Sequence, residues 1–193
     1  MKIALIIIGV VAALGLVAYG AGSLIPRDHV AARRLVMKSA TPEAVWARIA
    51  DTAAAPRWRK DVKQVTRLPD RDGHEVWREE FASGNTLAYE TIESVPPSRL
   101  VRRIVDEQLF GGTWTIVVTA EGAGAEVTVT ESGWVESPPF RIVAKYLMGY
   151  DGTINAYLTD LAASFGETAK PAPCDSVCER PANSHPPLTP SST

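Results

Sequence analysis

The fold is decided by the last apolar segment of the chain, residues 140–166, which read FRIVAKYLMGYDGTINAYLTDLAASFG. Within it, large apolar side chains recur at steps of four, three and four residues, at Ile154, Leu158, Leu161 and Phe165. This spacing places them on one face of a helix. That face must be buried against another layer, and the chain upstream offers mainly short β-type runs. The sequence therefore predicts one long helix wrapped by a sheet.

Seven strands are predicted from runs of alternating or β-branched residues that end in turn residues. They are residues 30–38, 62–68, 75–81, 86–93, 100–106, 113–120 and 126–135. The short gaps between the last six favour antiparallel neighbours. Two short helices precede these six, at 42–50, with Thr41 as its N-cap, and at about 53–61. The predicted fold class is α+β, with a seven-stranded antiparallel sheet around a long carboxy-terminal helix.

The amino-terminal residues form an uncharged run, 3–25, that is long enough for a helix to cross a hydrocarbon core of roughly 30 Å. We expect residues 1–26 to anchor the chain as a single-pass protein of a bacterial-type cell membrane. A cleaved signal peptide is the alternative, because Ala18-Tyr19-Gly20 resembles a cleavage site. The side of the membrane stays open, because cations flank both ends of the run: Lys2, Arg27, Arg33 and Arg34.

The carboxy-terminal residues 168–193 are rich in proline and poor in large apolar side chains, and we expect them to be disordered. They contain Cys174 and Cys178, which would form a small disulfide loop in an oxidising compartment and stay free thiols in the cytoplasm. Two cysteines without histidines at ligand spacing do not indicate a metal site. Residues 27–167 remain as one domain, and its scattered basic residues exclude a nucleic-acid-binding class.

The order of these elements, together with several motifs, resembles the START-like helix-grip superfamily (SRPBCC), which includes the polyketide cyclase/dehydrase-like proteins. The motifs are TPEAVW at 41–46 with Asp51, Trp58, Tyr89-Glu90 before PPSRL at 96–100, GTWT at 112–115 and VTVTE at 127–131. The resemblance covers residues 30–166. It implies a cavity between sheet and helix that holds a lipid-like, sterol-like or polyketide-like molecule, and some members are enzymes. An anchor before the first strand resembles a recurring bacterial variant.

The last predicted strand indicates which side chains face inward. Val127, Val129 and Val135 share odd parity with Glu131, so the carboxylate points inward unless a bulge at Gly133 shifts the register. A buried carboxylate must be protonated, paired with an arginine or exposed to a wet cavity. The candidate arginines are Arg102, Arg78 and Arg103.

Inward positions on the strands and helix give a predicted ligand site of eight residues: Trp77, Tyr89, Trp114, Ile116, Val129, Glu131, Tyr150 and Ile154. Aromatic side chains at such positions either wall a pocket or pack the core, and tyrosine hydroxyls either orient a polar ligand end or face solvent. The histidines His29, His74 and His185 have no evident nucleophile partner. We expect no metal and no cofactor.

The leading hypothesis is a membrane-tethered, non-catalytic domain that binds a hydrophobic, lipid-like or polyketide-like molecule. One alternative is a cyclase or dehydratase that uses Glu131 as acid or base. Another is an interaction module with a vestigial pocket, in which the proline-rich tail recruits a partner. The identity of the ligand and the oligomeric state are left open.

Overall fold

The computed structural model describes residues 2–174. Its strands are β1 (Asp28–Met37), β2 (Val62–Arg71), β3 (His74–Phe81), β4 (Thr86–Val95), β5 (Arg99–Val105), β6 (Phe110–Glu121), β7 (Gly124–Val135) and β8 (Ala172–Pro173). Its helical elements are α1 (Lys2–Ser23), α2 (Pro42–Ala50), the 3-10 helix η1 (Thr52–Arg57), α3 (Pro138–Ile142), the π-helix η2 (Val143–Met148) and α4 (Gly152–Ser164).

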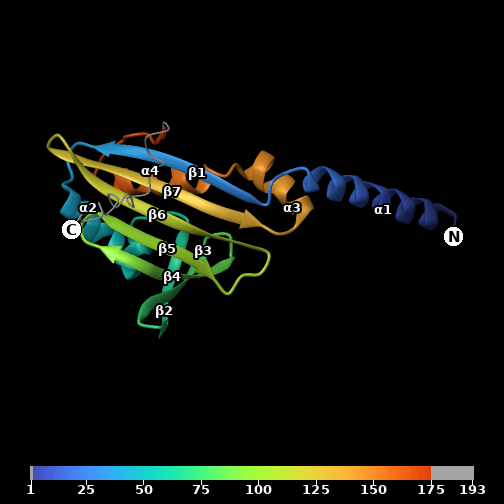
Figure 1. Ribbon diagram of the computed structural model, residues 1–193, viewed down its shortest axis with the longest axis horizontal. Helices are drawn as coiled ribbons and strands as arrows, with labels where there is room; N and C mark the ends of the chain where they lie inside the picture. The colour runs from blue at the N-terminus through green and yellow to red at the C-terminus, as the bar shows by residue number, and fades with distance from the viewer. Residues whose placement is uncertain (1, 175–193) are drawn as a thin grey trace, which may run out of the picture.

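The strands form one antiparallel sheet in the order β2-β3-β4-β5-β6-β7-β1-β8 (Figure 1). β1 returns beside β7 along its whole length, from Asp28 opposite Trp134 to Met37 opposite Ala125. All seven predicted strands are present, with ends within three residues of those expected. The α+β fold class is confirmed.

The eighth strand was not predicted. β8 pairs with Arg33 and Arg34 on the free edge of β1, and it comes from residues 168–174, which the sequence assigned to the tail. Cys178 lies outside the described residues, so the expected disulfide loop with Cys174 stays a prediction.

α2 begins where the sequence predicts it to begin. The Thr41 Oγ1 accepts a hydrogen bond from the Ala44 amide at 3.3 Å, and Pro42 occupies the first turn. The second predicted helix is shorter than expected: it is the six-residue 3-10 helix η1, which starts at an Asp51 cap and contains Pro56. Proline has no amide to continue a helical hydrogen-bond ladder, which favours a short element here.

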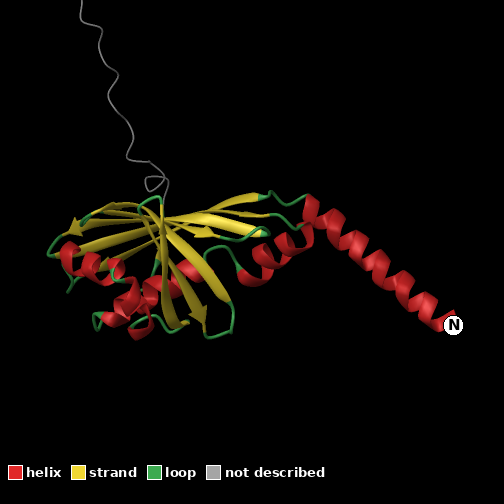
Figure 2. Ribbon diagram, turned by 90° about the horizontal axis from the view of Figure 1, so that it is seen from below, coloured by secondary structure: helices red, strands yellow, loops and turns green. Residues whose placement is uncertain are grey.

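The single long helix expected over residues 140–166 is wrong, because the chain forms three pieces there: α3, η2 and α4 (Figure 2). The break follows η2 at Gly149, whose φ of +69° is a conformation that glycine adopts without strain. Only α4 carries the predicted apolar stripe.

The core lies between α4 and the concave face of the sheet. Ile154, Leu158 and Leu161 of α4 are completely buried, and they pack with inward side chains of β1, β6 and β7. Burying each of these three side chains contributes about 1.5–3 kcal/mol. In Figure 2, α4 lies under the same face of the sheet as α2 and η1.

α1 extends away from the domain (Figure 1). Its residues 6–23 form a helix that is long and apolar enough to cross a membrane, and a signal sequence has the same length and apolarity. Almost none of this stretch is buried, in contrast to the core helix of a soluble domain. Its carboxyl end packs closely on α3, since a Cβ added at Gly22 would lie 1.9 Å from the Pro138 carbonyl oxygen. The two helices therefore touch backbone to backbone.

Candidate ligand-binding site

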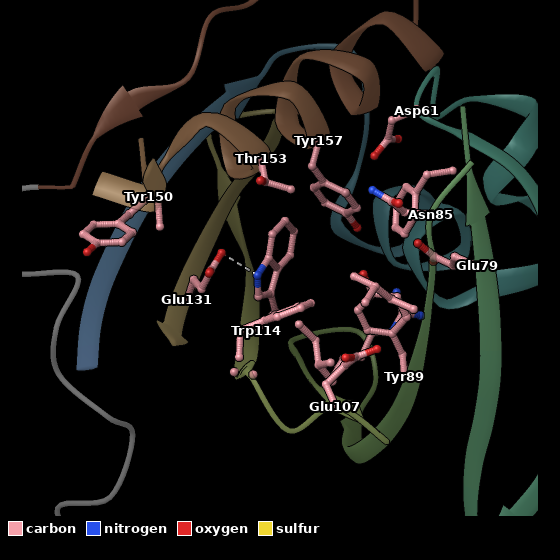
Figure 3. A pocket seen from close by; sticks show the side chains of 18 of the residues that line it. Asp61, Glu79, Asn85, Tyr89, Glu107, Trp114, Glu131, Tyr150, Thr153 and Tyr157 are labelled. Carbon is pink, nitrogen blue, oxygen red and sulfur yellow. Dashed lines mark hydrogen bonds between the residues drawn. The ribbon is translucent and has the colours of Figure 1, made fainter. Parts of the chain in front are cut away.

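A cavity of about 790 Å³ lies between the inner face of the sheet and the helical segment 140–157 (Figure 3). Strands β3 to β7 supply most of its apolar wall, including Trp77, Phe81, Ile104, Trp114, Ile116 and Val135. The helical side adds Phe140, Ala144 and Tyr157. A large space with mainly aromatic and aliphatic walls is typical of small-molecule sites, in which polar side chains orient the ligand.

The exposed lining residues mark where the cavity meets solvent. On the sheet side they are Ala82, Ser83, Asn85 and Thr86, in and beside the β3–β4 turn, and Glu107 in the β5–β6 loop. On the helical side they are Phe140 and Thr153. The opening therefore runs between these two loops and the broken helix.

Six of the eight predicted site residues line this cavity: Trp77, Tyr89, Trp114, Ile116, Glu131 and Tyr150. Val129 and Ile154 do not, because both are completely buried in the hydrophobic core. Strand parity gave the correct face for Val129. Parity does not say where along the strand packing ends and the cavity begins.

Glu131 is held by two neighbours on the cavity wall. The Trp114 Nε1 donates to the Glu131 Oε2 at 2.8 Å, and the His29 Nε2 lies 3.5 Å from the Oε1. The β6–β7 register runs unbroken through Gly133, so no bulge turns the carboxylate outward. The arginine partners considered from the sequence, Arg102, Arg78 and Arg103, are therefore wrong.

His29 was missed because it was placed before the first strand. β1 starts at Asp28, so His29 shares its inward parity with Ala31 and Leu35. Tyr150 stacks on its ring at a centroid distance of 3.9 Å, while the His29 Nδ1 is buried without a partner. A Cβ added at Gly133 would lie 2.6 Å from the imidazole, so this glycine makes room for the ring.

A second polar cluster lies across Trp114 from Glu131 (Figure 3). The Arg59 Nη1 donates to Glu79 at 2.8 Å, and its Nη2 lies 2.9 Å from Asp61. Burial by itself would lower the pKa of Arg59, but the charges of Glu79 and Asp61 outweigh it and raise that pKa. The Trp77 Nε1 also donates to Glu79, at 3.2 Å. This network holds Glu79 as a buried, paired carboxylate.

Two further polar groups of this cluster lack partners. The Arg102 Nη2 donates to the Ile49 carbonyl at 2.8 Å and the guanidinium covers the Trp77 ring at 4.9 Å, but its buried Nε has no hydrogen-bond partner. The Tyr157 hydroxyl is also buried without one. Burial raises the pKa of both Tyr157 and Tyr89, so these hydroxyls stay protonated and able to donate.

Sequence reasoning missed the inward roles of Arg102 and Glu79. On β5, Leu100, Arg102 and Ile104 alternate with Val101, Arg103 and Val105, so both faces carry the same residue types. Glu79 shares parity with Trp77 and Phe81, and this was the available signal for an inward carboxylate. Within residues 2–174, no group of three or more His, Cys, Asp or Glu side chains is arranged to hold a metal ion.

The family model for "Polyketide cyclase / dehydrase and lipid transport" matches residues 29–165. No curated protein sequence matches.

Solved structures resemble the domain in fold. A START superfamily protein from Mycobacterium smegmatis has a TM-score of 0.57 at 14% identity, covering 72% of this chain and 97% of that one. Ginseng major latex-like protein 151 from Panax ginseng has 0.58 at 12% identity, covering 72% and 99%. The Zhui aromatase/cyclase from Streptomyces sp. R1128 has 0.53 at 12%, covering 69% and 93%.

Identities this low show a shared fold and nothing more. The fold agrees with the resemblance seen in the sequence motifs, and the family match spans the domain from β1 to the end of α4. The chain belongs to the polyketide cyclase / dehydrase and lipid transport family.

Proposed function

We propose that residues 27–167 bind a hydrophobic small molecule in the cavity between the sheet and the helical segment 140–157. The carrying observation is the cavity volume of about 790 Å³, within the roughly 300–1,000 Å³ typical of small-molecule sites. Its aromatic and aliphatic walls favour an apolar ligand body, and the family to which the chain belongs includes lipid transport in its description.

The proposal includes a membrane tether in residues 1–26. α1 has 22 residues, about 33 Å at 1.5 Å per residue, which suits a hydrocarbon core of roughly 30 Å. The neighbouring π-helix η2 exposes Tyr146 and Leu147, and Phe140 lies at the cavity opening. An apolar opening next to the anchor shortens the aqueous path of an insoluble ligand.

Ligand binding is tested by purifying the full-length chain from membranes in detergent and identifying extracted apolar molecules by mass spectrometry. We expect a molecule that stays with the wild type and is depleted from Ala144→Trp, because Ala144 lines the cavity and an indole there takes up part of the space for the ligand. Ala156→Trp on the exposed face of α4 is the matched control. Equal retention by Ala144→Trp and the wild type would place the ligand outside the cavity.

The tether is tested by fractionation and intact mass. Full-length chain should sediment with membranes, keep its first residues and become soluble when residues 2–23 are deleted. A mature mass that lacks the segment before about residue 20 would establish the signal-peptide alternative instead.

The contact between His29 and Glu131 favours a second candidate, a cyclase or dehydratase. In this scheme Glu131 removes a proton from a carbon beside a substrate carbonyl, and a tyrosine hydroxyl donates to the carbonyl oxygen. Glu131→Gln should then lower turnover of a cyclising substrate by about 10²–10⁴-fold with little loss of binding. Glu126→Gln, on the outer face of the same strand beside Arg34, is the control. Unchanged turnover in Glu131→Gln would eliminate this mechanism.

A further inference from the structure

The cavity contains a guanidinium whose charge has no ion-pair partner. Arg102 is the cavity-lining arginine on β5, and among residues 2–174 no carboxylate lies within salt-bridge distance of it. One of its nitrogens is used by the Ile49 carbonyl, and its Nε is buried without a partner. Leaving a buried donor of a charged group unpaired is costly, so such a group in a ligand cavity indicates a missing acceptor.

Tyr157 supplies a second unpaired donor in the same cavity. It is 6% exposed, lines the same cavity and projects from α4 toward the strands (Figure 3). Trp114 connects the two groups, because it lies opposite Arg102 in the β5–β6 register and edge-on to the Tyr157 ring. The Tyr157 ring packs edge-on against Trp58 and Trp114, at 5.3 and 5.5 Å between centroids. An indole has no strong acceptor, so these neighbours leave the hydroxyl without a strong partner.

The other charges around this place are already matched. Arg59 pairs with Glu79, whose side chain is only 5% exposed, and with Asp61, which is 42% exposed and therefore solvated. Arg59 therefore has two carboxylate partners, whereas Arg102 has none within residues 2–174. Glu131 does not supply the balance, because Arg102, Trp114 and Glu131 occupy successive strands and the Trp114 indole takes the carboxylate.

We propose that Arg102 and Tyr157 bind the carboxylate of an amphipathic ligand whose apolar body fills the rest of the cavity. This inference rests on the proposed function and assigns the ligand class as a long-chain or polycyclic carboxylic acid. A singly charged carboxylate supplies the ion-pair partner that Arg102 lacks, and its two oxygens match the planar guanidinium. A doubly charged phosphate would add a negative charge beside Glu79. The ligand then lies with its acid group on the Tyr157 side of Trp114, away from Glu131.

The test compares probes that share one alkyl chain. Radiolabelled palmitic acid, methyl palmitate, cetyl alcohol and cetyl phosphate are equilibrated at neutral pH with the full-length chain in lipid nanodiscs. Empty nanodiscs give the amount that partitions into lipid. We expect the acid to bind the wild type about 10-fold or more tightly than the ester and the alcohol, because charge-assisted hydrogen bonds are the strong ones.

Substitutions then locate the site. Arg102→Gln should remove the preference for the acid and leave ester binding unchanged, and Tyr157→Phe should reduce the preference. Arg103→Gln is the matched control, since the neighbouring Arg103 points to the outer face and pairs with Glu90 at 2.8 Å. If Arg102→Gln fails to fold, the wild-type comparison and Tyr157→Phe decide the matter.

The outcomes separate the two proposals. Ester and alcohol binding as tight as that of the acid would overturn the carboxylate site and leave a hydrophobic cavity. Tighter binding of cetyl phosphate would assign the site to phosphate and overturn the carboxylate as well. Absence of protein-dependent binding by all four probes would refute the proposed function itself.

Discussion

The substitution Glu79→Gln tests whether the buried pair with Arg59 stabilises the cavity wall. The Glu79 carboxylate accepts hydrogen bonds from the Arg59 Nη1 at 2.8 Å and the Trp77 Nε1 at 3.2 Å, and its side chain is 5% exposed. The glutamine amide of Glu79→Gln keeps one acceptor oxygen but lacks the negative charge of the carboxylate. A hydrogen bond to a charged group contributes about 1.5–3 kcal/mol, and Arg59 keeps Asp61 as a partner. We therefore expect a loss of about 1.5–3 kcal/mol in the free energy of unfolding.

The measurement is a urea titration of the full-length chain in detergent, followed by the fluorescence of the five tryptophans, which all lie within residues 46–134. Glu80→Gln makes the same charge change on the next residue, which has no ion pair within the described part of the chain. In Arg59→Met/Glu79→Gln the two losses should be less than additive, by about 0.5–3 kcal/mol. A Glu79→Gln loss below about 0.5 kcal/mol, or equal to that of Glu80→Gln, would refute the stabilising role of the pair.

Three further perturbations test other parts of the fold. Leu158→Ala in α4 should cost about 2–5 kcal/mol of unfolding free energy in the same titration, and a loss under about 1 kcal/mol would contradict its core role. Gly133→Ala should move the His29 ring by about 0.8 Å, which is the difference between the 2.6 Å contact and an ordinary contact of 3.4 Å. It should also lower the free energy of unfolding by about 1–3 kcal/mol in the same titration. Unchanged stability together with unchanged NMR shifts of the imidazole would contradict this packing. Hydrogen bonds from the Ser39 hydroxyl and backbone lower the pKa of Glu167 from 4.5. Because the pKa of Glu167 is lower in the folded state, its ionised carboxylate stabilises the fold at pH values above the unfolded-state pKa. This stabilisation is lost as the pH falls through the folded-state pKa. Glu167→Gln should therefore lower the free energy of unfolding at pH 7, and the stabilities of variant and wild type should converge in acid. A stability difference that does not change with pH would contradict this role of Glu167.

Most of the sheet could be predicted because each strand carries its own local signal. On β7, three valines of odd parity fixed both the strand and its inner face, and the turn residues fixed the ends. The broken helix could not be predicted in this way. Residues 140–149 have the apolar content of a helix that packs on a core, so their composition does not mark a break. The positive φ at Gly149 depends on the three-dimensional path between α3 and α4. β8 is two residues long and depends on the free edge of β1, so no local pattern marks it.

Prediction of the candidate site was limited by the same kind of information. Alternation placed Trp114 and Glu131 on the cavity face, but it also placed Val129 there, which is buried in the hydrophobic core. The partners of Glu131 depend on contacts across two strands, and an error of two residues in the start of β1 concealed His29. Arg102 was considered only as a partner for Glu131. The alternation along a single strand does not show which side chains of other strands and helices lie near it.

The contact between Gly22 and Pro138 determines how freely the domain would move on its anchor. Four residues, 24–27, connect α1 to β1, and Arg141 donates to the Ile25 carbonyl within this connection and to the Glu136 carbonyl just after β7. A long flexible linker lets a domain sample many heights and tilts, and a connection this short does not. With α1 in a bilayer, the cavity entrance beside Phe140 would stay at a fixed height above the lipid headgroups. Exchange of ligand with the membrane would then need no rotation of the whole domain.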